Sequence, residues 1–375
     1  MSELEPLLAE MVRIDSTHPG MGGPGEAAFS AYLARRMEAL GLEVDVWDVR
    51  PGRPNVVGRL AGSGGGASLM LLGHLDVVAP WGPEAFEPVV RDGRMYGRGA
   101  ADMKSGFAAM LLAAEALLAG GAKLRGDLYL AGVIDEEWES AGAEALPARY
   151  RPDACLLLEC TGLDVVTEHG GFAWYEIESH GVEAAGADPE HGVDAIALLA
   201  PVLAGISALD AELAVRPCAS YGRGSIHAST IEGGTQLPAY PGSCTLGVER
   251  CTIAGETLAQ SRAEMEDLLT AARAADPRFS AELRTVVARE AMHMEHDEPV
   301  VRAVAAAAEA ALGRPATLAG DIAWGDSGLL VEAGVPCVTF GPVGHGEHTA
   351  GEWVDLGSVA QTAAVAEGAA RLFCG

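Results

Sequence analysis

The stretch from Ser68 to Val78 reads SLMLLGHLDVV and places a histidine and an aspartate directly after a short apolar run. Such a run is typical of a strand that is buried on both faces of a sheet. On either side of it, strand-like runs at residues 42–49, 55–60, 127–134 and 154–158 alternate with helix-like segments at residues 26–40 and 103–118. Strands that alternate with helices predict an α/β domain with a mostly parallel sheet.

The pattern changes between residues 169 and 285. There we predict a β-α-β-β-α-β order, which is typical of a small α+β domain of ferredoxin-like type. The prediction rests on strand-like segments at residues 174–179, 243–250 and 279–287, helix-like segments at residues 193–213 and 256–275, and a Gly- and Pro-rich stretch at residues 222–242. The α/β pattern returns from residue 299. The sequence therefore predicts one catalytic domain from residues 1–168 and 286–375, interrupted by an inserted domain over residues 169–285.

The chain of 375 residues has 25 Lys and Arg against 53 Asp and Glu, a net charge of −28. A field of this sign repels phosphate backbones and anionic lipids, so we expect neither nucleic acid nor a membrane as a partner. The longest uncharged apolar stretch, residues 195–209, is shorter than the ~20 residues that span a bilayer. The 7 scattered cysteines form no CxxC pair, and the acidic N-terminus lacks the pattern of a secretory signal. We therefore expect a cytoplasmic protein with free thiols.

Five short segments carry most of the residues that are capable of chemistry. Four of them follow predicted strands, and the carboxyl ends of parallel strands meet at one edge of a sheet, where ligands bind. We therefore expect their side chains to lie together despite the long separations in sequence. The segments are Gly73–Asp76, Gly97–Gly106, Asp135–Glu137, Glu159–Thr161 and His345–Glu352.

Each of these segments has an ordinary structural interpretation when it is taken alone. A His-x-Asp is commonly a hydrogen-bonded pair, a Glu-Glu after a strand commonly caps a helix, and Gly-Arg-Gly is commonly a turn. Their joint placement at strand ends favours a metal site instead. Imidazole and carboxylate ligands without thiolates suit zinc, cobalt or manganese. The supply is sufficient for two ions, with one histidine and one carboxylate for each and one carboxylate shared.

The segments GHLDVV, GRGAADMKSG, DEE, E-x-T and H-T-A-x-E-W-V, in this order, resemble one superfamily of metallohydrolases. It contains acetylornithine deacetylase, succinyl-diaminopimelate desuccinylase, aminoacylase and glutamate carboxypeptidase (peptidase family M20). The resemblance covers almost the whole chain and includes Gly186–Ile196 and Val248–Glu256 in the inserted domain. It implies a zinc-exopeptidase-like catalytic domain with a lid and dimerisation domain. It also implies hydrolysis of an N-acyl-amino acid or a short peptide, with acetylornithine-deacetylase-like members as the nearest branch.

The resemblance also implies a ligand set for two divalent ions, of zinc, cobalt or manganese. His74 and Glu159 match the terminal ligands of one ion, and Glu137 and His348 match those of the other. Asp102 matches the carboxylate that bridges the two ions.

Three further residues match positions of known function in this superfamily. Asp76 matches the acid that orients His74 through its second ring nitrogen. Glu136 matches the general base, which takes a proton from the attacking water and passes it to the leaving amine. Arg250 matches an arginine that binds the substrate carboxylate. The asparagine of the superfamily's G-G-T-x-x-Asn-x-x-Pro motif is Pro238 here, which puts the usual contact to the substrate amide in doubt.

The chain departs from the superfamily at a lid histidine that stabilises the oxyanion. Its position falls on Ala184 when the segment is aligned from Pro189, and on Ala185 when it is aligned from Gly181. Loss of one oxyanion donor typically costs ~10²–10³ in turnover. The alternative to an active hydrolase is therefore an impaired or non-enzymatic member that binds metal and acyl-amino acids.

Two further expectations concern a rival mechanism and the assembly. Gly325–Gly328 reads Gly-Asp-Ser-Gly, the nucleophile turn of trypsin-like serine proteases, but the α/β pattern and the place of this turn before a helix argue against that mechanism. We also expect a homodimer that forms through the inserted domain. The long apolar helix and the segment Trp174–Ser179, interpreted as an edge strand, are the predicted contacts.

Overall fold

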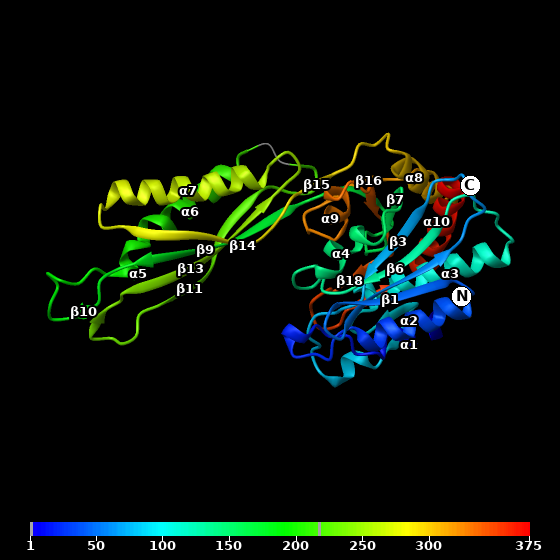
Figure 1. The fold of residues 1–375 in the computed structure, drawn as a ribbon, viewed down its shortest axis with the longest axis horizontal. Helices are drawn as coiled ribbons and strands as arrows, with labels where there is room; N and C mark the ends of the chain where they lie inside the picture. Colours follow the sequence, from blue (N-terminus) through cyan, green and yellow to red (C-terminus); the bar gives the residue numbers. More distant parts are fainter. Residues whose placement is uncertain (1–2, 217–218) are drawn as a thin grey trace. The chain divides into compact units, whose positions relative to one another are not determined.

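The computed structural model describes residues 3–216 and 219–375, which form two compact units (Figure 1). Unit 1 comprises the chain up to Thr167, Met294–Ala319 and Gly325–Gly375, and unit 2 comprises Glu168–His293 and Gly320–Trp324. Unit 2 thus extends further toward the C-terminus than the predicted inserted domain of residues 169–285, and it takes in a short later segment.

Unit 1 contains a mixed sheet in which six strands run in the order β1-β2-β6-β3-β7-β17. The central strands β6, β3, β7 and β17 are parallel to one another, whereas β1 and β2 are antiparallel at one side. The predicted α/β fold with a mostly parallel core is confirmed. The bounds are β1 Glu43–Arg50, β2 Arg53–Leu60, β3 Leu69–His74, β6 Leu128–Val133, β7 Ala154–Leu157 and β17 Cys337–Thr339.

Every residue of β3 is buried, as its apolar run predicts. Helix α2 packs against β1 and β2, and α10 packs against α3 and α8. Helix α3 buries ten of its residues because alanine, leucine and methionine surround it on nearly all sides. The helices of unit 1 are α1 Leu4–Val12, α2 Ala27–Ala39, α3 Ser105–Ala119, α4 Ala141–Ala145, α8 Pro299–Leu312, α9 Ser327–Glu332 and α10 Leu356–Cys374.

A smaller sheet of unit 1 has the order β18-β19-β5-β4 and joins two distant parts of the chain. Its central pair is β19 with β5, in which Trp353 pairs with Tyr96. This sheet therefore brings the chain just before residue 97 next to the chain just after residue 352. The bounds are β4 Val89–Arg91, β5 Arg94–Tyr96, β18 Gly344–His345 and β19 Trp353–Asp355. Short helical turns span Pro19–Met21, Pro83–Phe86, Ala100–Lys104 and Leu146–Ala148.

Unit 2 contains a four-stranded antiparallel sheet of order β11-β13-β9-β14. With its two long helices the chain order is β9-α6-β11-β13-α7-β14, which is the expected β-α-β-β-α-β arrangement. Both α6 and α7 lie on one face of the sheet (Figure 1), and they bury an apolar core against it. The bounds are β9 Gly171–His180, α5 Ala195–Leu198, α6 Ala200–Leu213, β11 Ser225–Gly233, β13 Ser243–Thr252, α7 Leu258–Ala275 and β14 Ser280–Arg289.

Shorter strands complete the described part of the chain. In unit 2, β10 pairs with β12 in a two-stranded ladder. Strands β8, β15 and β16 lie where the chain passes from one unit to the other. The bounds are β8 Val165–His169, β10 Ala184–Ala185, β12 Ala239–Tyr240, β15 Met292–His293 and β16 Leu318–Asp321.

Two sequence-based expectations for unit 2 are wrong. The segment Trp174–Ser179 is not an edge strand, because β9 pairs with β13 on one side and with β14 on the other. The edges of this sheet are β11 and β14. The Gly- and Pro-rich stretch at residues 222–242 contains the nine-residue strand β11, whose polar and mostly exposed residues gave no apolar alternation to detect.

The segment Ala195–Leu213 is long and apolar enough to cross a membrane by length and composition. It exceeds the uncharged stretch of the sequence analysis because it includes Asp210 and Glu212. In unit 2 its apolar residues Val202 and Ile206 are buried in the core under the sheet. A helix in the core of a protein can have the same length and apolar composition as a membrane-spanning helix, so this segment alone does not indicate a membrane span.

Candidate metal centre

Four of the predicted segments follow β3, β6, β7 and β17 at their carboxyl ends. Because these strands are parallel neighbours, the segments emerge at one edge of the sheet. Asp102 reaches the same place from the turn before α3. The structure thus brings the five predicted metal ligands together.

His74 forms the first of two ligand groups. Its Nε2 atom lies 2.9 Å from Oδ1 of Asp102 and 3.0 Å from Oε1 of Glu159. Its Nδ1 atom lies 3.0 Å from the main-chain oxygen of Asp76. Since a carbonyl oxygen only accepts, Nδ1 carries a proton in this contact, so Nε2 is the ring nitrogen that is left to face an ion.

His348 forms the second group around the other oxygen of the same aspartate. Its Nε2 atom lies 3.1 Å from Oδ2 of Asp102 and 3.0 Å from Oε2 of Glu137. Asp102 therefore contacts both histidines, one with each carboxylate oxygen. This arrangement has two groups of one histidine and one glutamate with a shared aspartate.

The carboxylate of Asp76 has main-chain partners in addition to the predicted one, His74. Its oxygens accept hydrogen bonds from the main-chain N–H groups of Glu136 (3.2 Å) and Glu137 (3.1 Å). The distance from His74 Nδ1 to Asp76 Oδ1 is 3.7 Å, beyond hydrogen-bond length. Asp76 thus orients His74 through its main-chain oxygen and holds the glutamate pair with its side chain.

A second buried network supports the turn that carries the glutamate pair. Asp135 has a positive φ of 77° and accepts from His18 Nε2 at 2.7 Å, from Arg53 at 2.7 Å and from the N–H of Ala141 at 3.3 Å. Because the N–H of Gly20 donates to His18 Nδ1, the proton of His18 is on Nε2 and points at Asp135.

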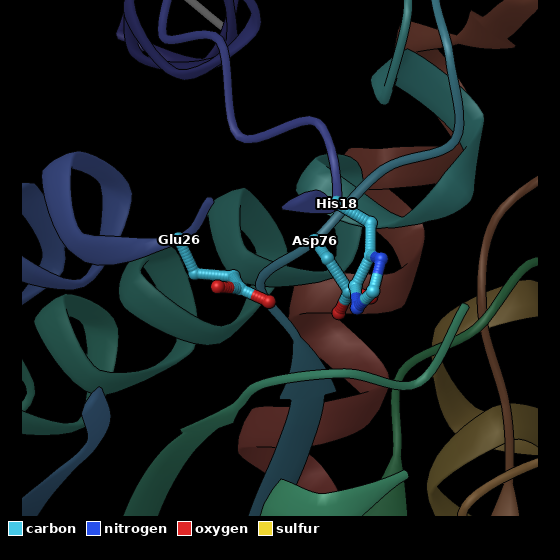
Figure 2. Close-up of side chains that lie close together, drawn as sticks. All are labelled: His18, Glu26 and Asp76. Carbon is cyan, nitrogen blue, oxygen red and sulfur yellow. The ribbon is translucent and has the colours of Figure 1, made fainter. Parts of the chain in front are cut away.

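His18, Glu26 and Asp76 also lie close together (Figure 2). The guanidinium of Arg53 donates to both oxygens of Glu26. This third group of histidine and carboxylates therefore already has its cation, and we interpret it as a structural support and not as a metal site.

The charged groups of the centre shift one another's pKa values. Hydrogen bonds to Asp102 and Glu137 raise the pKa of His348 to about 10. Burial raises the pKa of Glu137 to about 7, and the charge of Asp102 adds to this shift. Burial opposes ionisation of Asp102, but its contacts with His348 and His74 outweigh burial and lower its pKa. The crowded carboxylates therefore favour positive charge at their centre.

The donor set fits divalent ions. Tetrahedral ligand atoms about 2.1 Å from zinc lie about 3.4 Å from one another, close to the 2.9 to 3.1 Å separations in the two groups. Within the described residues, Oε1 of Glu137 is buried without a hydrogen-bond partner. A buried carboxylate oxygen without a partner is costly unless a cation or a donor satisfies it.

Glu136 is not a member of the two groups that share Asp102, although it forms a further close cluster with His74 and Glu137. Its Oε2 atom is 3.9 Å from Nε2 of His74, further than the oxygens of Asp102 and Glu159. Burial raises the pKa of Glu136 well above its usual range. A carboxylate next to the centre with an elevated pKa suits the exchange of a proton at neutral pH.

Asp326 is a buried acid near the centre to which the sequence analysis gave no role. Burial raises its pKa to about 7, and the negative charges of Asp76 and Glu159 add to the shift. Neither of its oxygens makes a hydrogen bond of good geometry within the described residues, although the Ser140 hydroxyl lies near enough to oppose the shift. The sequence feature that could indicate this acid is the Gly-Asp-Ser-Gly turn, in which Asp326 directly precedes Ser327.

Ser327 of that turn is a buried residue of unit 1. Its side chain is buried, and its Oγ atom lies 3.5 Å from the Thr339 hydroxyl. It also stands at the start of α9 within an α/β unit. The serine-hydrolase alternative has no support from these contacts.

Arg250 belongs to unit 2, and its guanidinium has acidic partners there. It is 1% exposed and donates to Glu264 at 2.9 Å and to both oxygens of Glu256 at 3.0 and 3.1 Å. A further donor is used by the main-chain oxygen of Cys251. Its binding of a substrate carboxylate stays a prediction, while these contacts give it a structural role within the unit.

The positions aligned with the lid histidine lie in β10. Ala184 pairs with Tyr240 and Ala185 with Ala239 of β12. The nearest histidine after them, His191, is exposed and lies 2.8 Å from Asp188. None of these contacts supplies a replacement donor from the described residues in or directly after β10.

Comparison with known proteins gives a matching family and several relatives. The model of peptidase family M20/M25/M40 matches residues 70–372. A deformylase of Bacillus subtilis that acts on N-formyl-4-amino-5-aminomethyl-2-methylpyrimidine is 28% identical over 361 residues, covering 87% of this chain and 84% of its own. An acetylornithine deacetylase of Myxococcus xanthus is 28% identical over 394 residues, covering 99% and 98%.

Solved structures show the same fold. Aminopeptidase PepT of Bacillus cereus has a TM-score of 0.82 at 22% identity and covers 99% of this chain and 98% of its own. The YXEP protein of Bacillus subtilis, described as a dinuclear metal-binding peptidase, has a TM-score of 0.73 at 16% identity and covers 100% and 98%.

Proposed function

Since the chain belongs to peptidase family M20/M25/M40, we propose that it is a dinuclear metal-dependent deacylase that removes a small acyl group from an amine, with an N-acyl-amino acid as the typical substrate. The observation that carries this proposal is Asp102, whose two oxygens contact two separate histidine–glutamate groups. A shared carboxylate between two such groups is the arrangement that two-metal hydrolases use.

In the proposed reaction, His74, Glu159 and Asp102 would hold one ion, and His348, Glu137 and Asp102 would hold the other. Ions of zinc, cobalt or manganese would supply Lewis acidity there for the amide carbonyl and for a water molecule. Glu136 removes a proton from that water, and the resulting hydroxide adds to the carbonyl carbon. Glu136 then returns the proton to the amine nitrogen as the C–N bond breaks, which releases the acid and the amine.

Asp76 contributes to this reaction by positioning other side chains. Its carboxylate fixes the main chain of the Glu136–Glu137 pair. One glutamate therefore stays free for proton transfer while the other faces His348.

The substrate class rests on what the two sequence relatives are named for. One removes a formyl group and the other an acetyl group, so both release a one- or two-carbon acid from an amine. The structural neighbours that act on peptides are less than 25% identical and support the fold alone. A small acyl group is therefore a better supported substrate feature than a peptide.

A substrate panel tests this proposal. The purified protein, loaded with zinc, cobalt or manganese in turn, is assayed with N-formyl-, N-acetyl- and N-succinyl-amino acids, with dipeptides, and with the formylated pyrimidine of the Bacillus relative. We expect formyl or acetyl substrates to have the highest kcat/KM. A preference for dipeptides would overturn the deacylase assignment but leave the hydrolase class intact.

A second candidate is an impaired member of the family that binds acyl-amino acids without efficient turnover. The specific observation in its favour is alanine at both positions that align with the lid histidine. Single-turnover assays with enzyme in excess separate the two candidates, because an impaired member binds the substrate but forms less than one equivalent of product over hours.

We also propose that the protein forms a homodimer through unit 2 and is located in the cytoplasm. Of the two edges of the unit 2 sheet, β11 is the better candidate, since its residues from His227 to Gly233 are exposed and include Ile231 at 53%. The other edge, β14, carries Glu282 and Arg284, and charges protect an edge from pairing.

We expect Ile231→Lys to convert the dimer to a monomer, because a charge at the pairing edge opposes strand association. The matched control is Val286→Lys on β14, where the side chain is 43% exposed, and this variant should remain dimeric. Light scattering at micromolar concentration measures both. A monomeric parent protein, or dissociation only of the Val286 variant, contradicts the proposed interface.

A further inference from the structure

Glu352 lies at the end of the His345–Glu352 segment and has no role in the proposed reaction. Its side chain is fully buried, and it follows His348 by four residues. Its contacts are with the turn that carries Asp102, 250 residues earlier in the chain. Glu352 therefore links two segments that each contribute a predicted metal ligand.

The carboxylate of Glu352 accepts four hydrogen bonds from this turn. Oε1 accepts from the main-chain N–H groups of Ala101 (2.9 Å) and Asp102 (3.1 Å). Oε2 accepts from the N–H of Gly99 (3.1 Å) and from Nη1 of Arg98 (2.6 Å). One carboxylate thus satisfies successive donors up to and including Asp102 itself.

The main chain makes the same connection. The N–H of Gly97 donates to the main-chain oxygen of Glu352 at 3.1 Å. The flanking strands β5 and β19 pair directly before Gly97 and after Glu352. Because β19 also pairs with β18, the loop that carries His348 is closed at both ends by this small sheet.

We propose that Glu352 is a positioning residue of the metal centre: by holding the main chain at Asp102, it fixes the shared carboxylate relative to His348 and so sets the affinity of both metal sites. This inference rests on the metal centre proposed above. If Glu352 served only to neutralise the charge of Arg98, its contact with Nη1 of Arg98 would be sufficient. Its three further hydrogen bonds, from the N–H groups of Gly99, Ala101 and Asp102, hold the main chain on both sides of Ala101.

Glu352→Gln is the informative substitution because it keeps the shape of the side chain. A glutamine amide has one oxygen, which accepts hydrogen bonds, and one NH₂ group, which only donates. The NH₂ group would therefore stand against N–H donors that now donate to a carboxylate oxygen. Glu352→Asp keeps the charge but is one methylene shorter, so it cannot reach all four donors. Both variants should release the turn that carries Asp102.

Zinc affinity of the metal-free protein, measured by competition with a chromogenic chelator, gives a readout that is independent of turnover. We expect Glu352→Gln to weaken both sites by roughly 10- to 100-fold, the usual cost of losing a residue that supports metal ligands. Both sites should weaken because Asp102 is shared. With excess zinc, kcat should recover most of its parent value.

A matched control is Glu264→Gln, which weakens a part-buried carboxylate–arginine contact with Arg250 in unit 2. Its thermal stability should fall while zinc affinity stays unchanged. Parent-like zinc affinity of a folded Glu352→Gln or Glu352→Asp variant overturns the inference. Failure of the parent protein to bind zinc at all would instead contradict the proposed function.

A second measurement needs no substitution and so does not depend on the folding of a variant. In the metal-free parent protein, the amide hydrogens of Ala101 and Asp102 should exchange with solvent as slowly as in the zinc-loaded protein, because Glu352 already holds them. Rapid exchange that becomes slow only when zinc is added would show that the metal orders this turn, and would overturn the inference.

Discussion

Glu136→Gln should leave both metal sites occupied and reduce kcat by roughly 10²- to 10⁴-fold, the usual contribution of a general base. Glutamine has nearly the same shape, but its amide cannot accept the proton of the attacking water. The Glu136 side chain lies 3.9 Å from His74 and takes no part in the two ligand groups. Its loss therefore acts on proton transfer. Steady-state kinetics and elemental analysis of the same preparation measure turnover and metal content.

Glu137→Gln is the matched control, since it changes the neighbouring residue in the same way. Glu137 contacts Nε2 of His348 at 3.0 Å, so the amide should weaken one metal site. Excess metal should then restore much of the lost activity, which it should not do for Glu136→Gln. If the two variants exchange these properties, the roles of the glutamate pair are reversed.

Introducing a histidine at the lid position should raise kcat by roughly ten- to a thousandfold, the range expected for one oxyanion donor. Such a donor acts mainly in the transition state, so KM should change little. Substitution at β10 is preferable to insertion, because an inserted residue would shift the pairing of Ala184 and Ala185 with β12. Successive residues of a strand point to opposite faces.

Ala184→His and Ala185→His therefore form a natural pair, in which each variant is the control of the other. We expect one of them to raise kcat on the best substrate of the panel and the other to have little effect. Metal content should be the same in both. If neither variant is faster and the parent protein already turns over rapidly, another residue supplies the donor, and His180 and His227 are the next to mutate.

The sequence predicts the centre of the large sheet of unit 1 well, because the strands β3, β6 and β7 are almost fully buried. The runs that become β3, β6 and β7 are continuous apolar segments. His74 is the last residue of β3, and Glu137 and Glu159 lie within four residues of the ends of β6 and β7. Parallel pairing of these strands is therefore enough to predict that the three side chains meet. The bounds differ only by a few residues, since helix and strand ends depend on local hydrogen bonds.

Features that depend on pairing partners could not be predicted in the same way. Strand β9 reads as an alternating strand, but nothing local shows that both of its sides are paired. The carboxylate of Asp76 contacts main-chain N–H groups sixty residues away, and Glu352 does so across a still longer separation. Every residue except proline has a main-chain N–H group, so residue types do not indicate which of these groups a carboxylate contacts. Such contacts can be identified only from the three-dimensional structure.

Titration of the metal-free protein with zinc, followed by hydrolysis of an N-acetyl- or N-formyl-amino acid, tests the central claim most directly. The claim is that two histidine–glutamate groups share Asp102 and hold two ions. We predict that activity rises until two equivalents per chain are bound and that His348→Ala binds one equivalent. Activity that is independent of metal, or no bound zinc, cobalt or manganese after reconstitution, would contradict the account.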